Sequence, residues 1–585
     1  MSNFKTQDVV FGRSLRDPDY RVDFAVGTTY SLDLDTFISL PFSLGFLEEP
    51  DEVMKKSVAY IFSALRLCSD RLAVFCNFSD IKVPPQTRKV YYALMEGSVF
   101  SVNASRRKNQ IVNFHPKVWV VKETSLAGDS KVKVIIMSRN LTRDGSLDCV
   151  CVLDGHVGDK PASKVAQAKH EPLCAFLEYL GSKADSRKRT KIGHLIEDIR
   201  CIRSFETEGS AYDDYDFLPM GIQDYSGIET LKELTTESRD AVVVSPFLDD
   251  RTLERFSTVR NRFLLTREDS ITEKAVEMFG LENIWTMNPQ MIDNDLDESV
   301  DLHAKMYFST PRENSEHYLY LGSTNATQGG FDRNVEFLLR LRFRPNRTSF
   351  YDFRSYFTDD AEKRFSQMVG LPVGASDAQL EYQQSLALRR VVASIKDATV
   401  MPDEQKEGRY SVALRLASCE DAATIYPLMR PDLKSELTSG QVCFEGLSLI
   451  ELTEFYVVEC EELSRVVKIP TRGIPSERDD EICRQVIGSR SQFMDCISFL
   501  LSESKASYVI DRAMNSSLPT GSGEGEGEDV AFAAVYESML RQAYEDPDTF
   551  DDIRTFVDSL PADVVPQEFD SLYRMMCKAV KSVRR

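Results

Sequence analysis

The sequence predicts a layered α/β fold in which two similar halves pack together, followed by a C-terminal α+β accessory region. Three observations support this prediction: strand-like and helix-like runs alternate along the first 375 residues, one motif occurs there twice, and the character of the chain then changes. A chain of 585 residues also exceeds the usual size of a single domain. The expected division is a first half at 1–190, a second half at 191–375, a mixed β/α domain at 376–515, an acidic glycine-rich linker at 516–530 and a helical segment at 531–585.

The first half is expected to combine two helices with a sheet. Apolar residues recur at helical spacing over 53–67, and the run at 71–75 is typical of a short strand. Runs rich in Val and Ile at 118–121 and 131–137 predict two further strands. A helix over 173–180, with apolar side chains on one face, would cover this sheet.

The second half repeats the same alternation. Apolar runs at 241–247 and 262–265 predict buried strands, and the spacing at 273–279 predicts a helix. Two more strands are expected at 306–308 and 317–321. Such alternation in both halves favours layers of helices on sheets.

The C-terminal part has a different pattern with more short strands. The pattern predicts a helix over 378–398, strands at 410–416, 441–444 and 454–458, and a helix over 484–501. This composition indicates an accessory domain, and nothing in it names a ligand.

One motif is written twice, in the order His-x-Lys and then Ser-x-Asn. The copies are His115-x-Lys117 with Ser138-x-Asn140, and His303-x-Lys305 with Ser323-x-Asn325. In each copy the His-x-Lys leads into a strand-like run, and the Ser-x-Asn closes another. A pair of buried structural histidines is the alternative, and it does not explain why order, spacing and local structure are all duplicated.

These residue types suit the cleavage of a phosphate diester. A neutral imidazole can attack phosphorus and form a covalent intermediate, and a protonated imidazole can donate to the leaving oxygen. Histidine serves both roles because its ordinary pKa, about 6.5, makes both forms accessible near neutrality. The lysines would neutralise the non-bridging oxygens, and the asparagines would donate hydrogen bonds to them. The scheme requires no metal and no cofactor.

The duplicated motif resembles that of the phospholipase D superfamily over residues 25–345. Most members of that superfamily place an Asp five residues after the Lys, whereas this chain has Lys122 and Thr310 there. This departure resembles the tyrosyl-DNA phosphodiesterase branch and bacterial phospholipase D-like nucleases. The resemblance implies two α/β/α halves that form a pseudo-dimeric catalytic core, with His115 as nucleophile and His303 as general acid. The residues alone do not break the symmetry between the two histidines.

Two carboxylates are candidates for orienting the histidines. Glu336 follows the second motif on a strand-like run, and Asp148 follows the first motif before another such run. A carboxylate commonly fixes the tautomer and orientation of a functional histidine. For each residue, a solvated position on a strand is the alternative.

Four motif residues are predicted to bind substrate or to brace the turns. These are Ser138, Arg139, Ser323 and Thr324. The two interpretations are equally open for the serines, because turn residues and pocket residues share the same chemistry.

Net charge argues against nucleic-acid binding over the whole surface. The formal charge is −21, and a protein that binds DNA over its whole surface is basic. Basic residues near the motifs, at 106–108, at 186–191 and at positions 340, 342, 344 and 347, could nevertheless form a groove. Solvated faces are the alternative. No apolar run is long enough to cross a membrane, and no secretory leader is evident, so a cytoplasmic location is expected.

The leading hypothesis is a metal-independent phosphodiesterase that cleaves nucleic acid, with DNA as the expected substrate. The resemblance extends it to restriction or anti-phage defence in bacteria. The alternatives are removal of a tyrosyl adduct from DNA, phospholipid hydrolysis, or a scaffold subunit of a defence complex. In the last case the C-terminal region would bind a protein partner such as a helicase. Homo-oligomer formation is open.

Overall fold

The computed structural model describes most of the chain up to residue 486 and a C-terminal helix. The described residues are 20–38, 40, 44, 68–83, 90–105, 112–125, 127–142, 146–206, 212–288, 292–293, 298–299, 301–313, 316–361, 363–370, 378–417, 421–437, 440–486, 539, 557, 565 and 567–583. The predicted helix at 53–67, the basic run at 106–108 and the linker at 516–530 lie outside them.

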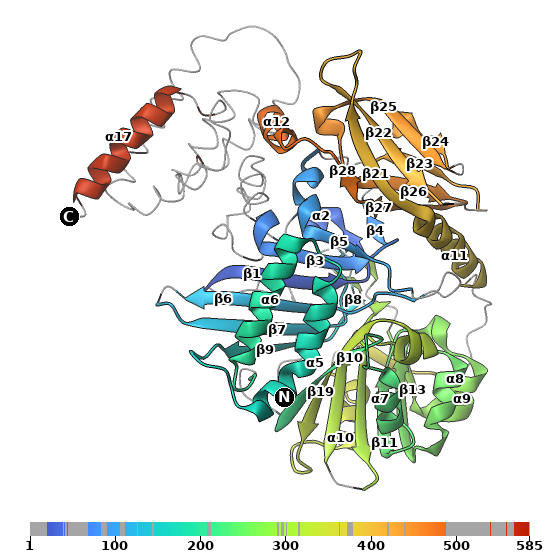
Figure 1. Ribbon diagram of the computed structural model, residues 1–585. Helices are drawn as coiled ribbons and strands as arrows, with labels where there is room; N and C mark the ends of the chain where they lie inside the picture. The colour runs from blue at the N-terminus through green and yellow to red at the C-terminus, as the bar shows by residue number, and fades with distance from the viewer. Residues whose placement is uncertain are drawn as a thin grey trace.

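The first half contains a six-stranded sheet with the order β5-β3-β1-β6-β7-β9. Its strands are β1 (Tyr20–Thr29), β3 (Leu72–Asn77), β5 (Val99–Val102), β6 (Val118–Ser125), β7 (Ser130–Met137) and β9 (Val150–His156). The strands β5, β3 and β1 are parallel, and β6, β7 and β9 continue the sheet as antiparallel neighbours. Helices α5 (Lys164–Gly181) and α6 (Ser186–Arg200) lie side by side across one face (Figure 1).

The second half contains an eight-stranded sheet with the order β10-β19-β18-β17-β11-β12-β13-β20. Its strands are β10 (Asp214–Met220), β11 (Ser238–Val244), β12 (Asn261–Thr266), β13 (Ile284–Met287), β17 (Met306–Pro311), β18 (His317–Gly322), β19 (Glu336–Phe343) and β20 (Phe365–Gln367). Six of them repeat the first sheet: β13, β12 and β11 are parallel, and β17, β18 and β19 follow as antiparallel neighbours. The predicted mixed α/β class is confirmed.

Helices cover both faces of the second sheet. On one face lie α7 (Gly227–Leu234), α8 (Asp250–Glu254) and α9 (Glu273–Phe279), and on the other lies α10 (Phe350–Thr358). Apolar side chains from both sheets form one continuous core. Phe176 of α5 contacts Phe337 of β19, with ring centroids 4.9 Å apart. The halves therefore pack directly against each other, which brings their two motifs together.

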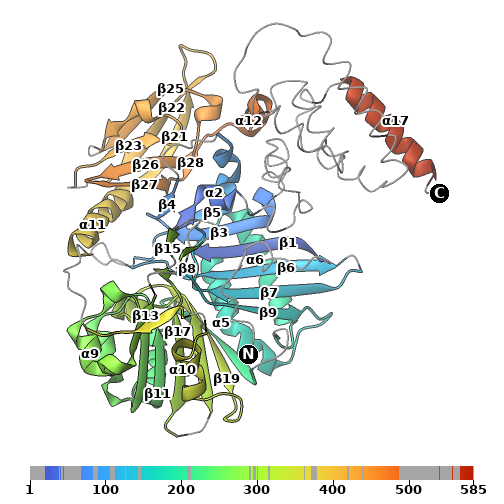
Figure 2. The ribbon, with the colours of Figure 1, turned by 180° about the vertical axis from the view of Figure 1, so that it is seen from behind.

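The C-terminal region forms a β-rich unit that packs against helix α11 (Ala378–Ser394), which lies below the sheets in Figure 2. One sheet contains β21 (Ile395–Pro402), β22 (Arg409–Leu416), β25 (Gln441–Ser448) and β28 (Thr471–Arg472). The other contains β23 (Thr424–Pro427), β24 (Ser435–Glu436), β26 (Phe455–Cys460) and β27 (Leu463–Lys468), and is extended by β4 (Ile81–Lys82) and β2 (Leu32–Asp33) of the first half. The first half thus shares a sheet with the C-terminal region.

Short elements complete the described chain. They are α2 (Leu34–Phe37), η2 (Val90–Ser98), β8 (Ser146–Leu147), η3 (Arg255–Thr258), η4 (Glu268–Ser270), η5 (Leu281–Asn283), β14 (Ile292–Asp293), β15 (Glu298–Ser299), β16 (Asp301–Leu302), η6 (Gly329–Arg333), η7 (Pro431–Leu433), η8 (Leu449–Glu451), α12 (Glu477–Val486) and α17 (Gln567–Val583). None of the helices placed in the structure has the length and apolar character needed to cross a bilayer.

Two predicted elements end earlier in the structure than the sequence predicts. The strand expected over 241–247 stops at Val244, because the chain then turns toward the second motif. The helix expected over 378–398 stops at Ser394, and the following residues pair with β22 as strand β21. Periodicity alone did not show this change, because the apolar spacing continues across the boundary.

Candidate active site

Each His-x-Lys segment is held by backbone pairing with the opposite half. Phe114 forms a parallel bridge with Val335, and the amide of His115 donates to the carbonyl of Val335 at 2.9 Å. In the second copy β16 pairs in parallel with β8, and the amide of His303 donates to the carbonyl of Leu147 at 3.0 Å. Glu336 and Asp148 are the residues that directly follow these two carbonyls.

The two histidines bind carboxylates in a crossed arrangement. Nδ1 of His115 lies 2.9 Å from Oε2 of Glu336, and Nδ1 of His303 lies 2.9 Å from Oδ1 of Asp148. The Glu336 side chain is 1% exposed and the Asp148 side chain 7%. A carboxylate accepts hydrogen bonds, so each Nδ1 carries the proton and each neutral ring leaves a lone pair on Nε2. Each half therefore supplies the orienting group for the other half's histidine.

Glu336 is fixed by donors from its own half. Ser323 Oγ donates to Glu336 Oε2, and Asn334 Nδ2 donates to Oε1 at 3.3 Å. Ser323 is itself held by the Phe337 amide, which donates to its hydroxyl at 3.0 Å. The serine is fully buried, which favours the bracing interpretation over direct substrate binding.

Asp148 is fixed in the same way. The hydroxyls of Ser138 and Ser146 donate to its two oxygens at 2.6 Å each, and the Cys149 amide donates to Ser138 Oγ at 2.9 Å. Burial opposes ionisation of Asp148, but the hydrogen bond from His303 and the charges of His303 and Lys305 hold its pKa well below the usual range. Asp148 is therefore a permanent anion in the site.

Both motif lysines are buried beside their histidines. Lys117 Nζ lies 3.1 Å from His115 Nε2 and donates to the His115 carbonyl at 3.1 Å. Lys305 Nζ donates to the His303 carbonyl at 2.6 Å. Burial and the charge of Lys305 lower the pKa of Lys117 well below its usual value, and burial lowers the pKa of Lys305 to about 8.

Both histidines are neutral near pH 7. Burial lowers the pKa of each to about 4, although the carboxylates oppose this shift. The charge of Lys305 contributes to lowering the pKa of His115, and the charge of Lys117 to lowering that of His303. The four groups thus act on one another electrostatically, as residues of a single site do.

The motif asparagines lie half-buried at the ends of their strands. Asn140 Oδ1 accepts from the Ser31 amide at 3.5 Å. Asn325 Oδ1 is buried, and no hydrogen-bond partner for it exists among the placed residues. Thr324 is fully buried with its hydroxyl toward Met220 Sδ, whereas Arg139 is half-buried. Substrate binding by these two residues remains a prediction.

Ion pairs neutralise most of the described basic residues of the predicted groove. The pairs are Arg340 with Asp216 and Glu233, Arg342 with Asp214 and Glu316, Arg344 and Arg347 with Asp213, and Arg187 and Lys191 with Asp70. These residues connect strands and helices, so the structure favours a structural role for them over a continuous phosphate-binding surface.

Three residues next to His115 have no counterpart in the motif. The Tyr30 ring lies against His115, with centroids 5.1 Å apart. Arg389 of α11 donates to Asn113 Oδ1 at 2.5 Å and to the Tyr30 hydroxyl at 2.7 Å. Sequence spacing gave no signal for Arg389, because the contact joins the C-terminal region to the first half.

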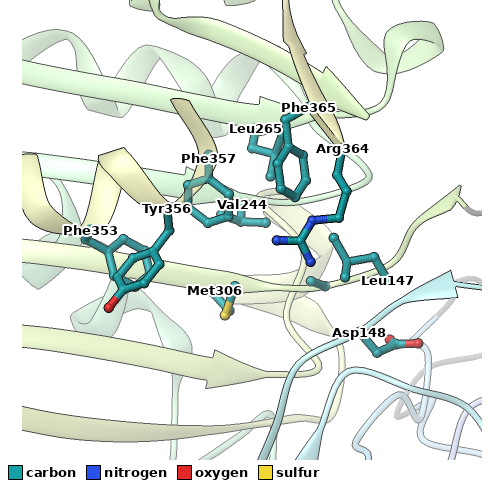
Figure 3. A pocket seen from close by; sticks show the side chains of 11 residues that line it. Leu147, Asp148, Val244, Leu265, Met306, Phe353, Tyr356, Phe357, Arg364 and Phe365 are labelled. Carbon is teal, nitrogen blue, oxygen red and sulfur yellow. The ribbon is translucent and has the colours of Figure 1, made fainter. Parts of the chain in front are cut away.

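An apolar cavity of about 70 Å³ lies beside Asp148 (Figure 3). Its walls are Leu147, Val244, Leu265, Ala304, Met306, Phe353, Tyr356, Phe357, Arg364 and Phe365. Within the described residues, no three His, Cys, Asp or Glu side chains are grouped as metal ligands.

Comparison with solved structures gives distant similarities. The chain is 11% identical to yeast tyrosyl-DNA phosphodiesterase, with 58% of this chain and 86% of that chain covered and a TM-score of 0.34. It is 10% identical to phosphatidylserine synthase from Haemophilus influenzae Rd KW20, with 66% of this chain and 91% of that chain covered and a TM-score of 0.36. It is also 10% identical to NucT from Helicobacter pylori, with 26% of this chain and 96% of that chain covered and a TM-score of 0.20. No family model and no curated protein sequence matches the chain.

Proposed function

We propose that this protein is a phosphodiesterase of the phospholipase D type that cleaves nucleic acid, with DNA as substrate, through a phosphohistidine. Its two halves would form a pseudo-dimeric catalytic core. The observation that carries the proposal is the crossed pairing of His115 with Glu336 and of His303 with Asp148. Neither histidine is oriented by its own half, so the chemistry needs both halves in one site.

In the first step His115 attacks and His303 protonates the leaving group. The Nε2 lone pair of His115 forms a bond to phosphorus, and the bond from phosphorus to the leaving oxygen breaks. His303 gives its proton to that oxygen and becomes neutral. The phosphorylated imidazole is positively charged, and Glu336 at Nδ1 offsets that charge.

In the second step water releases the phosphate. His303 takes a proton from the water as its oxygen bonds to phosphorus, and the bond from phosphorus to His115 Nε2 breaks. The products are an alcohol and a phosphate monoester, and both histidines return to their starting states. Neither step needs a metal ion.

The lysines and asparagines would stabilise the transferring phosphoryl group. Lys117 and Lys305 are buried, so their charges act through a medium of low polarity. Asn140 and Asn325 supply amide groups at the ends of the neighbouring strands. Donors of this type commonly contribute about 3–4 kcal/mol each to the transition state.

Removal of a tyrosyl adduct from DNA is the second candidate. The two positions that hold Asp in most relatives serve other contacts here: Lys122 pairs with Asp198 at 2.6 Å, and Thr310 bonds His317 at 3.0 Å. This departure is the one that resembles the tyrosyl-DNA phosphodiesterase branch. A defence role and a helicase partner for the C-terminal region remain predictions.

The test is cleavage of single- and double-stranded DNA in EDTA. Wild type should cleave, and His115→Ala and His303→Ala should each abolish cleavage. His194→Ala is the matched control, because His194 is exposed on α6 and outside the site. Cleavage that needs magnesium and survives both mutations would overturn the mechanism.

A further inference from the structure

Phe247 lies in the loop that follows strand β11, three residues beyond the last paired residue Val244. The strands β11 and β17 pair antiparallel up to Val244 and Met306. Phe247 comes three residues after Val244 along the chain, and His303 comes three residues before Met306. The chain leaves the sheet at this point, so Phe247 lies in the loop beside the second His-x-Lys segment.

This loop is tied to the second Ser-x-Asn motif. Leu248 forms a parallel bridge with Ala326, the residue after Asn325. Ser245 Oγ accepts from the Ala326 amide at 2.9 Å and donates to the Phe247 carbonyl at 2.8 Å. Phe247 is therefore held between the two segments that carry His303 and Asn325.

A guanidinium lies against the Phe247 ring. The Arg267 guanidinium carbon is 4.9 Å from the ring centroid. Arg267 is fixed in turn by the carbonyl of Leu302, which accepts from Nε at 2.9 Å, and by Asp301 at 2.6 Å. Its charge also acts on Lys305. The stacked pair thus adjoins the site directly.

The ring nevertheless remains open to solvent, with 45% of Phe247 exposed. A large apolar side chain that is rigid, cation-backed and open beside a phosphate-handling site offers a flat surface to a ligand. Aromatic side chains of this kind stack on nucleobases in proteins that bind single strands. A lipid acyl chain would instead need a wider apolar surface.

We propose that Phe247, backed by Arg267, is a stacking platform for the nucleobase next to the scissile phosphate. The inference rests on the proposed function and sharpens its substrate to a strand whose base at the cleavage site is unpaired. A base can lie on Phe247 only when it has left the stack of a duplex on that side.

The experiment compares an oligothymidylate with a strand of the same length whose sugars carry no bases. Phe247→Leu keeps an apolar side chain and removes the aromatic face. It should lower kcat/KM on the oligothymidylate about tenfold, within the range expected for one stacked base, and leave the abasic strand unchanged. Phe247→Tyr should retain activity on both. The abasic strand also reports folding of each variant.

Tyr351→Leu is the matched control, because Tyr351 is 65% exposed on α10 and carries no contact to the motifs in the described contacts. Equal loss in Tyr351→Leu and Phe247→Leu, or an equal effect of Phe247→Leu on both strands, would overturn the inference and leave the proposed function standing. Cleavage confined to fully paired duplex would do the same. No cleavage of any strand by wild type would overturn both.

Discussion

The two half-sites share one backbone plan and differ in what surrounds each histidine. In both, a histidine amide pairs with the opposite half, and a buried carboxylate from that half accepts from Nδ1. His115 has a lysine amine at its Nε2 and the Tyr30 ring against its face. His303 has no such neighbours in the described contacts.

This difference indicates a division of labour. Lys117 donates to Nε2 of His115, which favours the tautomer whose lone pair is on Nε2, the atom that would attack phosphorus. Lys117 can donate whether it is charged or neutral, because both forms keep an N–H. A carboxylate at Nδ1 stabilises an imidazolium at either histidine, so it does not distinguish the two. The contacts of His115 are consistent with His115 as nucleophile and His303 as acid, and this assignment remains a prediction.

The largest expected effect separates the histidines by leaving group. On DNA, His115→Asn and His303→Asn should each lower kcat by at least about 10²–10⁴-fold, because each removes an essential proton or electron-pair transfer. On a p-nitrophenyl phosphodiester, whose leaving group needs no proton, His303→Asn should still release a burst of nitrophenol equal to the enzyme. His115→Asn should give no burst. Rapid-quench measurement checks both, and a burst in His115→Asn alone would reverse the assignment.

The next effect tests the crossed contacts. Glu336→Gln and Asp148→Asn should each lower kcat by about 10–100-fold, as loss of an orienting partner usually does. Asp148→Asn should behave like the His303 variant and recover on the p-nitrophenyl substrate, whereas Glu336→Gln should not. If Asp148→Asn instead behaves like the His115 variant, and Glu336→Gln like the His303 variant, the crossed pairing is wrong.

A smaller effect is expected from the C-terminal region, whose described side-chain contacts beside the site reach the first half-site. Arg389 is 9% exposed and holds Asn113 and Tyr30 beside His115. Arg389→Met should lower kcat about tenfold with KM nearly unchanged, because it loosens a partner of the nucleophile. Arg389→Lys should recover part of the loss, since it keeps the charge but not the forked geometry.

Arg390→Met is the matched control. Arg390 is the next residue of α11, but its side chain is exposed and pairs with Asp421 at 2.7 Å. Its substitution should leave kcat unchanged. Equal losses in both variants would indicate that α11 affects stability only, and circular dichroism melting curves would show that directly.

The sequence predicted the site to the extent that the site depends on local spacing. The two His-x-Lys segments, the asparagines and both carboxylates are short-range features of strand ends, so a duplicated motif locates them. The crossing of Glu336 to His115 and of Asp148 to His303 depends on how the halves pack, and no spacing within one half encodes it. The same holds for Arg389, which reaches Asn113 from another region of the fold.

The fold was predictable where strands carry continuous apolar runs. Strands β3, β6, β7, β11, β12, β17 and β18 were predicted from such runs, whereas the ten-residue strand β1 is not among the predicted strands and the two-residue strands β2 and β4 carry no periodic signal. These two strands join the first half to the C-terminal sheet. Composition changes near residue 376, and this change predicts a domain boundary there. One sheet nevertheless contains strands from both sides of that position.

The smallest expected effect is a shift in pH dependence that tests the role of His303. The free enzyme holds the pKa of His303 at about 4, partly through the lysine charges, so the protonated acid becomes scarce as pH rises above 4. The parameter kcat/KM reports the free enzyme and should decline through this range. A bound phosphate offsets the charges of Lys117 and Lys305 and raises the pKa of His303, so kcat should remain flat to higher pH.

The leaving group again provides the control, because only a reaction that needs the acid should show this difference. With a p-nitrophenyl phosphodiester, the burst rate should not decline as the pH rises above about 4. Every substrate should still lose rate above about pH 8, where Lys305 gives up its proton. The profiles of kcat and kcat/KM could instead coincide, with one limb near the ordinary histidine pKa of about 6.5. That result would mean that the lysines do not lower the pKa of His303. The electrostatic difference between free and occupied site would then be absent.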